Sequence, residues 1–154
     1  MSNYSQAVAV KAIRTYYVFL AAKLGALLPS RIIEPPYGGW PSIAKETFAN
    51  LGKTDEVIEL LCHLPYIKDH SPGTEEWNTN IAYETSVIQY GSRKERMYEE
   101  IGQLAGKLPA HVVQLTEGGR YGSCLLLDTH EGTVALYSST NIVVCSNCYF
   151  LQVP

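Results

Sequence analysis

Residues 35–41, with the sequence Pro-Pro-Tyr-Gly-Gly-Trp-Pro, constrain the fold of this chain more than any other segment. Proline fixes φ and removes a backbone donor, and glycine permits positive φ, so the segment cannot lie inside a helix or a strand. It therefore predicts a rigid turn that separates an apolar N-terminal helix from everything that follows. Two large rings on such a turn must bury against the core or against a partner, and we expect them to point outward for recognition. The predicted partner-binding surface consists of Tyr37, Gly38, Gly39 and Trp40.

The length and composition indicate a single globular domain. A chain of 154 residues buries roughly 70% of its unfolded surface on folding, so it needs no metal or disulfide to hold a core. Only 18% of the residues are charged, while eleven are tyrosines, which predicts a sheet with a large packed face, an aromatic pocket or an adhesive interface. The net charge of −3 argues against general nucleic-acid binding, because neutralising phosphates requires a basic field.

Charge and cysteine usage predict a cytoplasmic protein. The first 33 residues carry four basic and no acidic side chains, whereas the rest of the chain carries eight basic and fifteen acidic ones. A basic amphipathic N-terminus is also typical of mitochondrial presequences, so the mitochondrion is the minor alternative. The longest nearly apolar run, Tyr16 to Leu28, is broken by Lys23 and is shorter than the ~20 residues that a bilayer requires. Since no secretory signal is recognised, the cysteines are expected to be thiols.

Apolar periodicity predicts three helices in the first half of the chain. Gln6 to Leu28 carries apolar residues at spacings of three and four, and its opposite side is only weakly polar, which is typical of a helix that is buried or packs on a partner. A short helix is expected over Ser42 to Asn50. A third begins after the cap residue Thr54 and ends at Pro65. The predicted inner side of this third helix consists of Val57, Ile58, Leu60, Leu61 and Leu64.

The second half of the chain is rich in β-forming residues. We expect a polar loop over residues 68–80, a strand from Ile81 to Tyr90 and a charged surface helix from Arg93 to Lys107. The β-rich runs that follow are Val112 to Leu115, Ser123 to Asp128, Thr133 to Tyr137 and Ile142 to Val153. The expected hairpin loops are Glu117 to Gly119 and Asp128 to Gly132. This order predicts an α+β fold, a single domain over residues 1–154 in which N-terminal helices pack on a mostly antiparallel sheet that ends in a β-meander.

The motifs that usually carry chemistry are weak or absent in this sequence. Cys145 and Cys148 form a CxxC, but zinc requires four ligands and residues three apart on a strand point to opposite faces, so two structural thiols are the main interpretation. A redox pair, or a metal knuckle completed by Cys62, His63 or His70, is the alternative. No nucleophile elbow, phosphate loop or complete metal set is present. The sequence therefore predicts no cofactor and no metal.

An enzymatic alternative rests on scattered titratable groups and on aromatic residues. Asp128 is expected to cap the second hairpin loop through its side chain, and a dyad with His111 from the neighbouring strand would suit acid–base catalysis. The candidate acids and bases are His63, His70, His111, Glu84 and Asp128. The aromatic residues that would line a pocket, together with Glu34 and Glu84, are Tyr37, Trp40, Trp77, Tyr83, Tyr90 and Tyr121. A hydrolase, isomerase or cyclase acting on an apolar metabolite would fit this set.

Two stretches of the chain resemble the SUKH superfamily, which contains fungal cell-wall-synthesis regulators and bacterial immunity proteins. The motifs that carry the resemblance are Gly38-Gly39-Trp40-Pro41, the helix end Leu60 to Pro65, and the hairpin from Leu125 to Val134, within Arg31 to Leu64 and Tyr121 to Tyr137. The run from Tyr37 to Ile67 is also similar to uncharacterised fungal proteins. The resemblance implies N-terminal helices packed on an antiparallel sheet, no shared catalytic residues and a protein-binding role.

These observations lead to two functional hypotheses. The resemblance and the absent catalytic motifs favour a non-enzymatic protein-interaction module in the cytoplasm of a fungus, which binds through the Tyr37–Trp40 turn. A protein partner or self-association is expected in that case, because the first helix is apolar on nearly all sides. The alternative is a small metabolic enzyme with an aromatic pocket for a small-molecule ligand. Neither hypothesis involves a nucleic acid or a membrane.

Overall fold

The computed structural model describes residues 4–24, 27–48, 52–68, 80–91, 108–118, 120–138 and 142–145. Its helices are α1 (Gln6–Phe19), which continues as the π-helix η1 (Leu20–Leu24), the short 3-10 helix η2 (Pro29–Arg31), α2 (Lys45–Phe48) and α3 (Asp55–His63). Its strands are β1 (Ile32–Ile33), β2 (Tyr66–Ile67), β3 (Asn80–Ala82), β4 (Thr85–Val87), β5 (Val112–Gln114), β6 (Thr116–Gly118), β7 (Ser123–Asp128), β8 (Thr133–Ser138) and β9 (Ile142–Cys145). None of the helices in these ranges is long and apolar enough to cross a bilayer.

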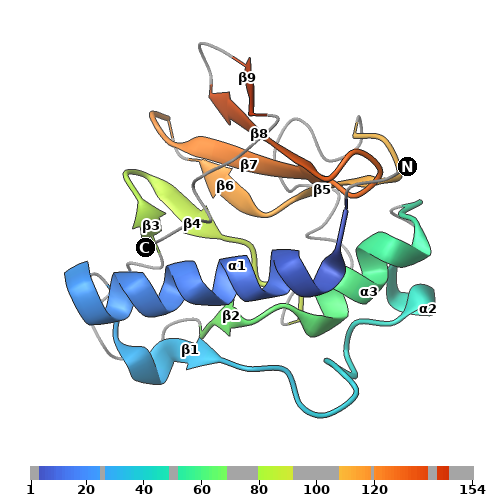
Figure 1. The fold of residues 1–154 in the computed structure, drawn as a ribbon, viewed down its shortest axis with the longest axis horizontal. Helices are drawn as coiled ribbons and strands as arrows, with labels where there is room; N and C mark the ends of the chain where they lie inside the picture. Colours follow the sequence, from blue (N-terminus) through green and yellow to red (C-terminus); the bar gives the residue numbers. More distant parts are fainter. Residues whose placement is uncertain are drawn as a thin grey trace.

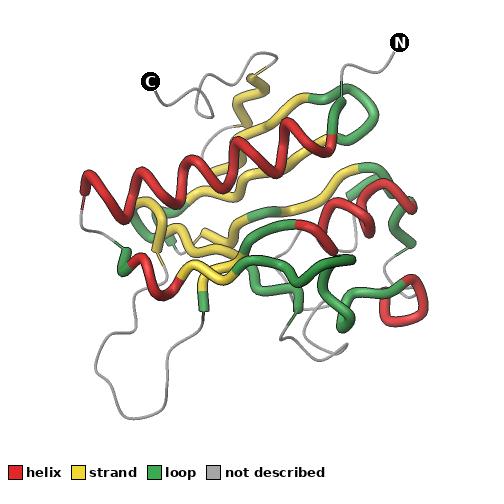
Figure 2. Tube along the Cα trace, turned by 60° about the horizontal axis from the view of Figure 1, so that its bottom comes forward, coloured by secondary structure: helices red, strands yellow, loops and turns green. Residues whose placement is uncertain are grey.

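The elements form the predicted α+β fold. The strands make three sheets, with the orders β1-β2, β3-β4-β6 and β5-β7-β8-β9. Neighbouring strands within each sheet are antiparallel. Helix α1 runs across the middle of the molecule, with β5, β7 and β8 on one side and β1 and β2 on the other (Figure 1). A second view shows the same helix lying along the strands (Figure 2). The core therefore lies between α1, α3 and the strands, and it combines residues from both halves of the chain.

Helix α1 has the predicted start and the predicted inner stripe, but it is not buried on all sides. Ile13, Tyr17 and Leu20 recur every three or four positions and are buried in the core. Val8 and Val18 on the outer side are exposed. Of the two predicted alternatives, burial of this helix within the protein on nearly all sides was therefore wrong, and packing on a partner stays a prediction. Leu28 also lies outside the helix, in an extended conformation, because Pro29 disfavours the α region for the residue before it.

Helices α2 and α3 differ in how closely they follow the prediction. Helix α3 begins after Thr54, whose hydroxyl accepts a hydrogen bond from the Val57 amide, and its predicted inner residues are all buried. Helix α2 starts at Lys45, three residues later than expected. The reason is that the Ile43 amide donates to the Trp40 carbonyl at 3.0 Å, which continues the preceding turn through Ser42. The predicted end of this helix at Asn50 lies outside the described residues.

Two strand predictions need correction. The connector after Pro29 contains strand β1, which pairs with β2 so that Ile32 lies opposite Ile67. Residues 81–90 do not form one strand, because Glu84 adopts a left-handed conformation, with φ of 45°, and the chain reverses there to make the β3–β4 hairpin. Strands of two or three residues are too short to show the alternation of apolar and polar residues by which a strand is recognised in sequence.

The loop expected at Glu117 to Gly119 is also partly strand. Residues Thr116–Gly118 form β6, which pairs with β4. Leu115 separates β6 from β5 and donates its amide to the Leu125 carbonyl at 2.7 Å, so the two short strands connect two sheets. Gly118 is required there, since a Cβ atom at this position would lie 2.6 Å from the carbonyl carbon of Gly122.

The β7–β8 hairpin is the part of the sheet that matches the prediction best. Its register runs from Ser123 opposite Ser138 to Asp128 opposite Thr133. The Asp128 carboxylate accepts hydrogen bonds from the amides of His130 and Glu131, at 2.8 and 2.9 Å, and so caps the turn as expected. The predicted helix from Arg93 to Lys107, the loop over residues 69–79 and the end of the last β-rich run lie outside the described residues.

Candidate functional site

An apolar cavity of about 400 Å³ lies between α1 and strands of all three sheets. We call it the α1–β8 cavity. The described residues that line it are apolar, aromatic or serine and threonine. The lining residues are Ile13, Tyr16, Tyr17, Leu64, Pro65, Tyr66, Ile81, Ala82, Tyr83, Thr85, Val87, Ile88, Tyr90, Leu115, Thr116, Tyr121, Ser123, Leu125, Val134 and Leu136. None of these described lining residues carries an ionised side chain.

Side chains on one face of the β7–β8 hairpin form one wall of the cavity. Leu125 lies opposite Leu136, and Val134 lies opposite Leu127 on the same face of the sheet. Leu126 points to the other face, because successive side chains on a strand alternate. The cavity-facing leucines, Leu125 and Leu136, are only half-buried. The sheet therefore presents an apolar surface toward α1 that the protein itself does not fully cover.

The opposite edge of the cavity is aromatic and meets solvent. Tyr83 is 76% exposed and Tyr121 is 65% exposed, yet both line the cavity. Glu84, in its left-handed conformation, accepts a hydrogen bond from the Tyr121 amide at 2.8 Å. The Arg120 guanidinium lies 5.5 Å from the centre of the Tyr121 ring. The hydrogen bond from Tyr121 thus joins the strained β3–β4 turn to the segment before β7 at the mouth of the cavity. Strained backbone is found most often at ligand-binding and active sites.

Hydrogen bonds to the backbone hold the wall in place. The Thr85 hydroxyl accepts from the Ser123 amide at 3.0 Å and donates to the Tyr83 carbonyl at 2.9 Å. The Thr116 hydroxyl accepts from the Leu125 amide at 2.8 Å and donates to the Ser123 carbonyl at 3.0 Å. Both threonine side chains are used in joining the two sheets. The cavity is therefore preformed by backbone contacts, as is usual for ligand sites.

Of the acids and bases that the sequence suggested, none of those in the described ranges lines this cavity. Glu84 lies at its mouth, but its carboxylate is directed to the Tyr121 amide. His63 lies at the end of α3, where its Nδ1 atom is 2.9 Å from the Glu59 carbonyl oxygen and 3.2 Å from Gln6 Nε2. His70 lies outside the described residues. The structure therefore separates His63 and Glu84 from each other and from the remaining pair.

The remaining pair, His111 and Asp128, does come together, as the dyad hypothesis required. The His111 Nε2 atom lies 3.7 Å from the Asp128 Oδ2 atom, and the His130 ring is 5.7 Å from that of His111. The pair is on the surface of the β7–β8 turn, where the other Asp128 oxygen caps the backbone. It does not line either of the hollows described here. Within the described ranges, no three metal-ligating side chains are grouped closely enough to hold an ion.

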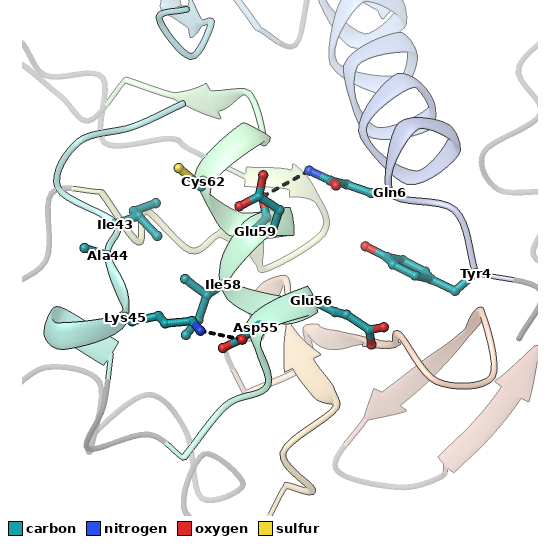
Figure 3. A pocket seen from close by; sticks show the side chains of 10 residues that line it. All are labelled: Tyr4, Gln6, Ile43, Ala44, Lys45, Asp55, Glu56, Ile58, Glu59 and Cys62. Atoms are coloured by element: carbon teal, nitrogen blue, oxygen red, sulfur yellow. Dashed lines mark hydrogen bonds and ion pairs between the residues drawn. The ribbon is translucent and has the colours of Figure 1, made fainter. Parts of the chain in front are cut away.

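A second hollow, of about 550 Å³, lies between the start of α1 and α3 (Figure 3). Two of its polar side chains, Lys45 and Asp55, form an ion pair, and the Gln6 side chain donates to the backbone carbonyl of Glu59 at 3.2 Å. The Cys62 thiol has a raised pKa because of burial, so it remains protonated at neutral pH. This hollow is mixed in polarity and open to solvent.

The turn at residues 35–41 displays one of its two rings. Tyr37 is fully exposed, at 107% of its reference area. Trp40 turns inward: its indole Nε1–H donates to the Leu64 carbonyl at 2.8 Å, and its ring centre lies 5.9 Å from that of Tyr66. Gly39 is buried against Cys62. The expectation that both rings point outward was therefore wrong for Trp40, and a partner-binding role for Tyr37 and Gly38 stays a prediction.

Of the aromatic residues suggested from the sequence as pocket-lining, Tyr83, Tyr90 and Tyr121 do line the cavity, whereas Tyr37 and Trp40 do not. Trp77 lies outside the described residues. Sequence reasoning missed Tyr17, Leu125 and Leu136, because a residue beside a cavity follows the same periodic pattern as a residue in a packed core. Only the placement of α1 relative to the sheet distinguishes the two.

Comparison of the chain with protein-family models, with characterised proteins and with solved structures found no match. The fold and the cavity define an α+β domain with an apolar site between its first helix and its sheet.

Proposed function

We propose that this protein is a non-enzymatic binding domain that holds a small apolar ligand in the α1–β8 cavity. The observation that carries the proposal is a preformed cavity of about 400 Å³ to whose lining the described residues contribute no charged side chain. Ligand sites typically have volumes of roughly 300–1,000 Å³ and mostly apolar walls. Protein interiors are otherwise close-packed, with few voids larger than a water molecule, so unfilled space of this size is unusual in a core.

The position of the titratable groups favours binding over catalysis. A general acid or base must lie about 2.6–3.2 Å from the proton that it transfers, or act through one water molecule. The described histidines and Asp128 do not line the cavity, and Glu84 is at its mouth. A ligand in the cavity would contact hydrocarbon and aromatic surfaces, which bind it without activating it.

The proposal predicts that a larger side chain on the cavity-facing side of β7 weakens ligand binding. The probe is N-phenylnaphthylamine, an uncharged dye whose fluorescence rises in apolar surroundings. Because the larger ring occupies the ligand volume, Leu125→Trp should weaken dye binding by at least about tenfold, equivalent to ~1.4 kcal/mol of binding free energy. Leu126→Trp is the matched control, since the neighbouring leucine lies on the other face of the same strand. Fluorescence titration measures both affinities.

Two further measurements make the test decisive. The thermal midpoint of each variant shows that it is folded, and Leu136→Phe fills the cavity from the strand opposite Leu125. The proposal would be overturned if the wild-type protein did not bind the dye, or if the Leu126→Trp variant lost binding as much as the Leu125→Trp variant.

A protein-binding role is the second candidate function, and the SUKH resemblance implies it. The observation that favours it is the complete exposure of the Tyr37 ring on a turn closed by the hydrogen bond from the Gly39 amide to the Pro36 carbonyl, at 2.9 Å. A rigid, exposed aromatic side chain loses little entropy when a partner covers it, and tyrosine is enriched among the residues that dominate interface energies.

Under this second candidate, Tyr37→Ala should reduce recovery of a specific partner from a fungal extract by about tenfold or more, as loss of an interface hot spot does. Val18→Ala is the control, because Val18 is exposed on α1, in another part of the molecule. Quantitative mass spectrometry of co-purified proteins provides the measurement. Equal recovery with the wild type and both variants would count against a binding surface at Tyr37.

A further inference from the structure

We propose that the ligand of the α1–β8 cavity carries a hydrogen-bond acceptor, such as a ketone carbonyl, which the Tyr17 hydroxyl recognises. This inference rests on the proposed function, and it identifies the class of ligand as uncharged, largely apolar and bearing one buried acceptor.

The buried and half-buried tyrosines around the cavity differ in what their hydroxyl groups contact. Tyr16 donates to the Ile81 carbonyl at 2.9 Å, Tyr66 to the Leu61 carbonyl at 2.7 Å and Tyr90 to the Gln114 carbonyl. The threonines of the wall are bonded to the backbone as well. In the part of the chain that the structure describes, the Tyr17 hydroxyl makes no hydrogen bond to another residue, and it is not among the side-chain atoms that are sealed from water.

Tyr17 is also well placed for recognition. It lies on the inner stripe of α1, it is only 5% exposed, and it is part of the cavity lining. A ligand that covered this hydroxyl without bonding to it would cost free energy, because the hydrogen bonds of the hydroxyl to water would be lost and not replaced. A ligand acceptor at this position would form that bond instead. The free energy of that bond would then contribute to binding.

The electrostatics of the cavity specify an uncharged ligand with an acceptor. The lining residues that the structure describes provide no ionised partner, so an ionised group taken in among them would lose its hydration without compensation. Burial raises the pKa of the Tyr17 phenol, and the group therefore stays protonated at neutral pH. A protonated phenol can donate its O–H hydrogen bond to a carbonyl or ether oxygen of a ligand.

Two uncharged naphthalene dyes test this inference. Prodan carries a ketone, and its emission shifts to the red when a donor bonds to that ketone, whereas N-phenylnaphthylamine has no carbonyl. Tyr17→Phe removes one oxygen atom and keeps the ring. We expect it to weaken prodan binding by about five- to tenfold, as the loss of one hydrogen bond does, to shift the emission of bound prodan to the blue, and to weaken N-phenylnaphthylamine binding much less.

The matched control is Tyr16→Phe, because Tyr16 also lines the cavity but its hydroxyl bonds to the Ile81 carbonyl. It should lower the thermal midpoint without discriminating between the dyes. Equal effects of Tyr17→Phe on both dyes, or on neither, would overturn the inference while leaving the cavity as a binding site. Failure of the wild type to bind N-phenylnaphthylamine would instead overturn the proposed function. If Tyr17→Phe does not fold, the wild type still decides, since a blue emission of bound prodan would mean that no donor meets its ketone.

Discussion

Replacing Gly39 with alanine is expected to lower the free energy of unfolding by about 4 kcal/mol, through backbone strain and overpacking together. Gly39 has a φ of +88°, which a residue with a side chain adopts only at a cost. A Cβ atom at this position would also overlap the Cys62 Sγ atom and lie 2.9 Å from the Cys62 carbonyl oxygen. That oxygen already accepts a hydrogen bond from the Trp40 amide at 2.9 Å, so α3 cannot move away without breaking it. Urea-induced unfolding measures the change.

Gly38→Ala is the matched control for this prediction. Gly38 has the same φ of +88°, but a Cβ atom there would meet no atom within 4 Å. The control should therefore lose only the strain of the left-handed conformation, about 1–2 kcal/mol. Equal losses in the two variants would show that close packing of the turn on α3 contributes nothing to stability.

Trp40→Ala is expected to cost about 3 kcal/mol of unfolding free energy, as the removal of a large, partly buried ring does. The substitution removes the packing of the indole on Tyr66 and on the core, and it leaves the Leu64 carbonyl without its donor. The Leu64 side chain is itself buried, so water does not readily replace the lost bond. Thermal and urea unfolding, followed by far-ultraviolet circular dichroism, measure the loss.

Two variants separate the contributions of this ring. Trp40→Phe keeps an aromatic ring and removes the indole N–H. It should therefore destabilise the protein much less than Trp40→Ala does, by the ~1 kcal/mol that the hydrogen bond contributes. Tyr37→Ala should leave the unfolding midpoint unchanged, since its ring touches nothing in the described structure and is fully exposed. A Trp40→Ala variant as stable as the wild type would contradict the assignment of Trp40 to the core.

The difference between these two rings bears directly on function. A turn that displayed both rings would support a two-residue recognition surface, but the structure commits Trp40 to the inside, on Tyr66. Tyr66 in turn lines the α1–β8 cavity. The turn therefore supports one wall of the cavity from behind, and it presents only Tyr37 outward.

Elements with a strong local pattern were predictable from the sequence. The cap residue and the apolar spacing of α3 place its start and its buried side correctly, and the alternation and turn residues of β7 and β8 place their hairpin. The start of α1 at Gln6 follows from the same periodicity. Each of these elements depends on residues within a few positions of one another.

The short strands and the arrangement of the candidate site were not predictable in this way. Nothing local distinguishes one strand over residues 81–90 from a hairpin with a left-handed Glu84, because the turn is stabilised by the Tyr121 amide from a distant part of the chain. The strand at Thr116–Gly118 likewise exists because β4 pairs with it. Glycines in a short strand resemble a loop in sequence.

The sequence alone determined the α+β class, the principal helices and the β7–β8 hairpin, since these follow from periodicity and turn chemistry. Only the tertiary structure decided that Trp40 faces inward, that His111 and Asp128 pair at the surface, and that Tyr17, Leu125 and Leu136 face unfilled space instead of a packed neighbour. The physical reason is that a cavity is the volume left between elements. Its presence depends on how far α1 stands from the sheet, and that distance is set by all the contacts of the core together and not by any local pattern in the chain.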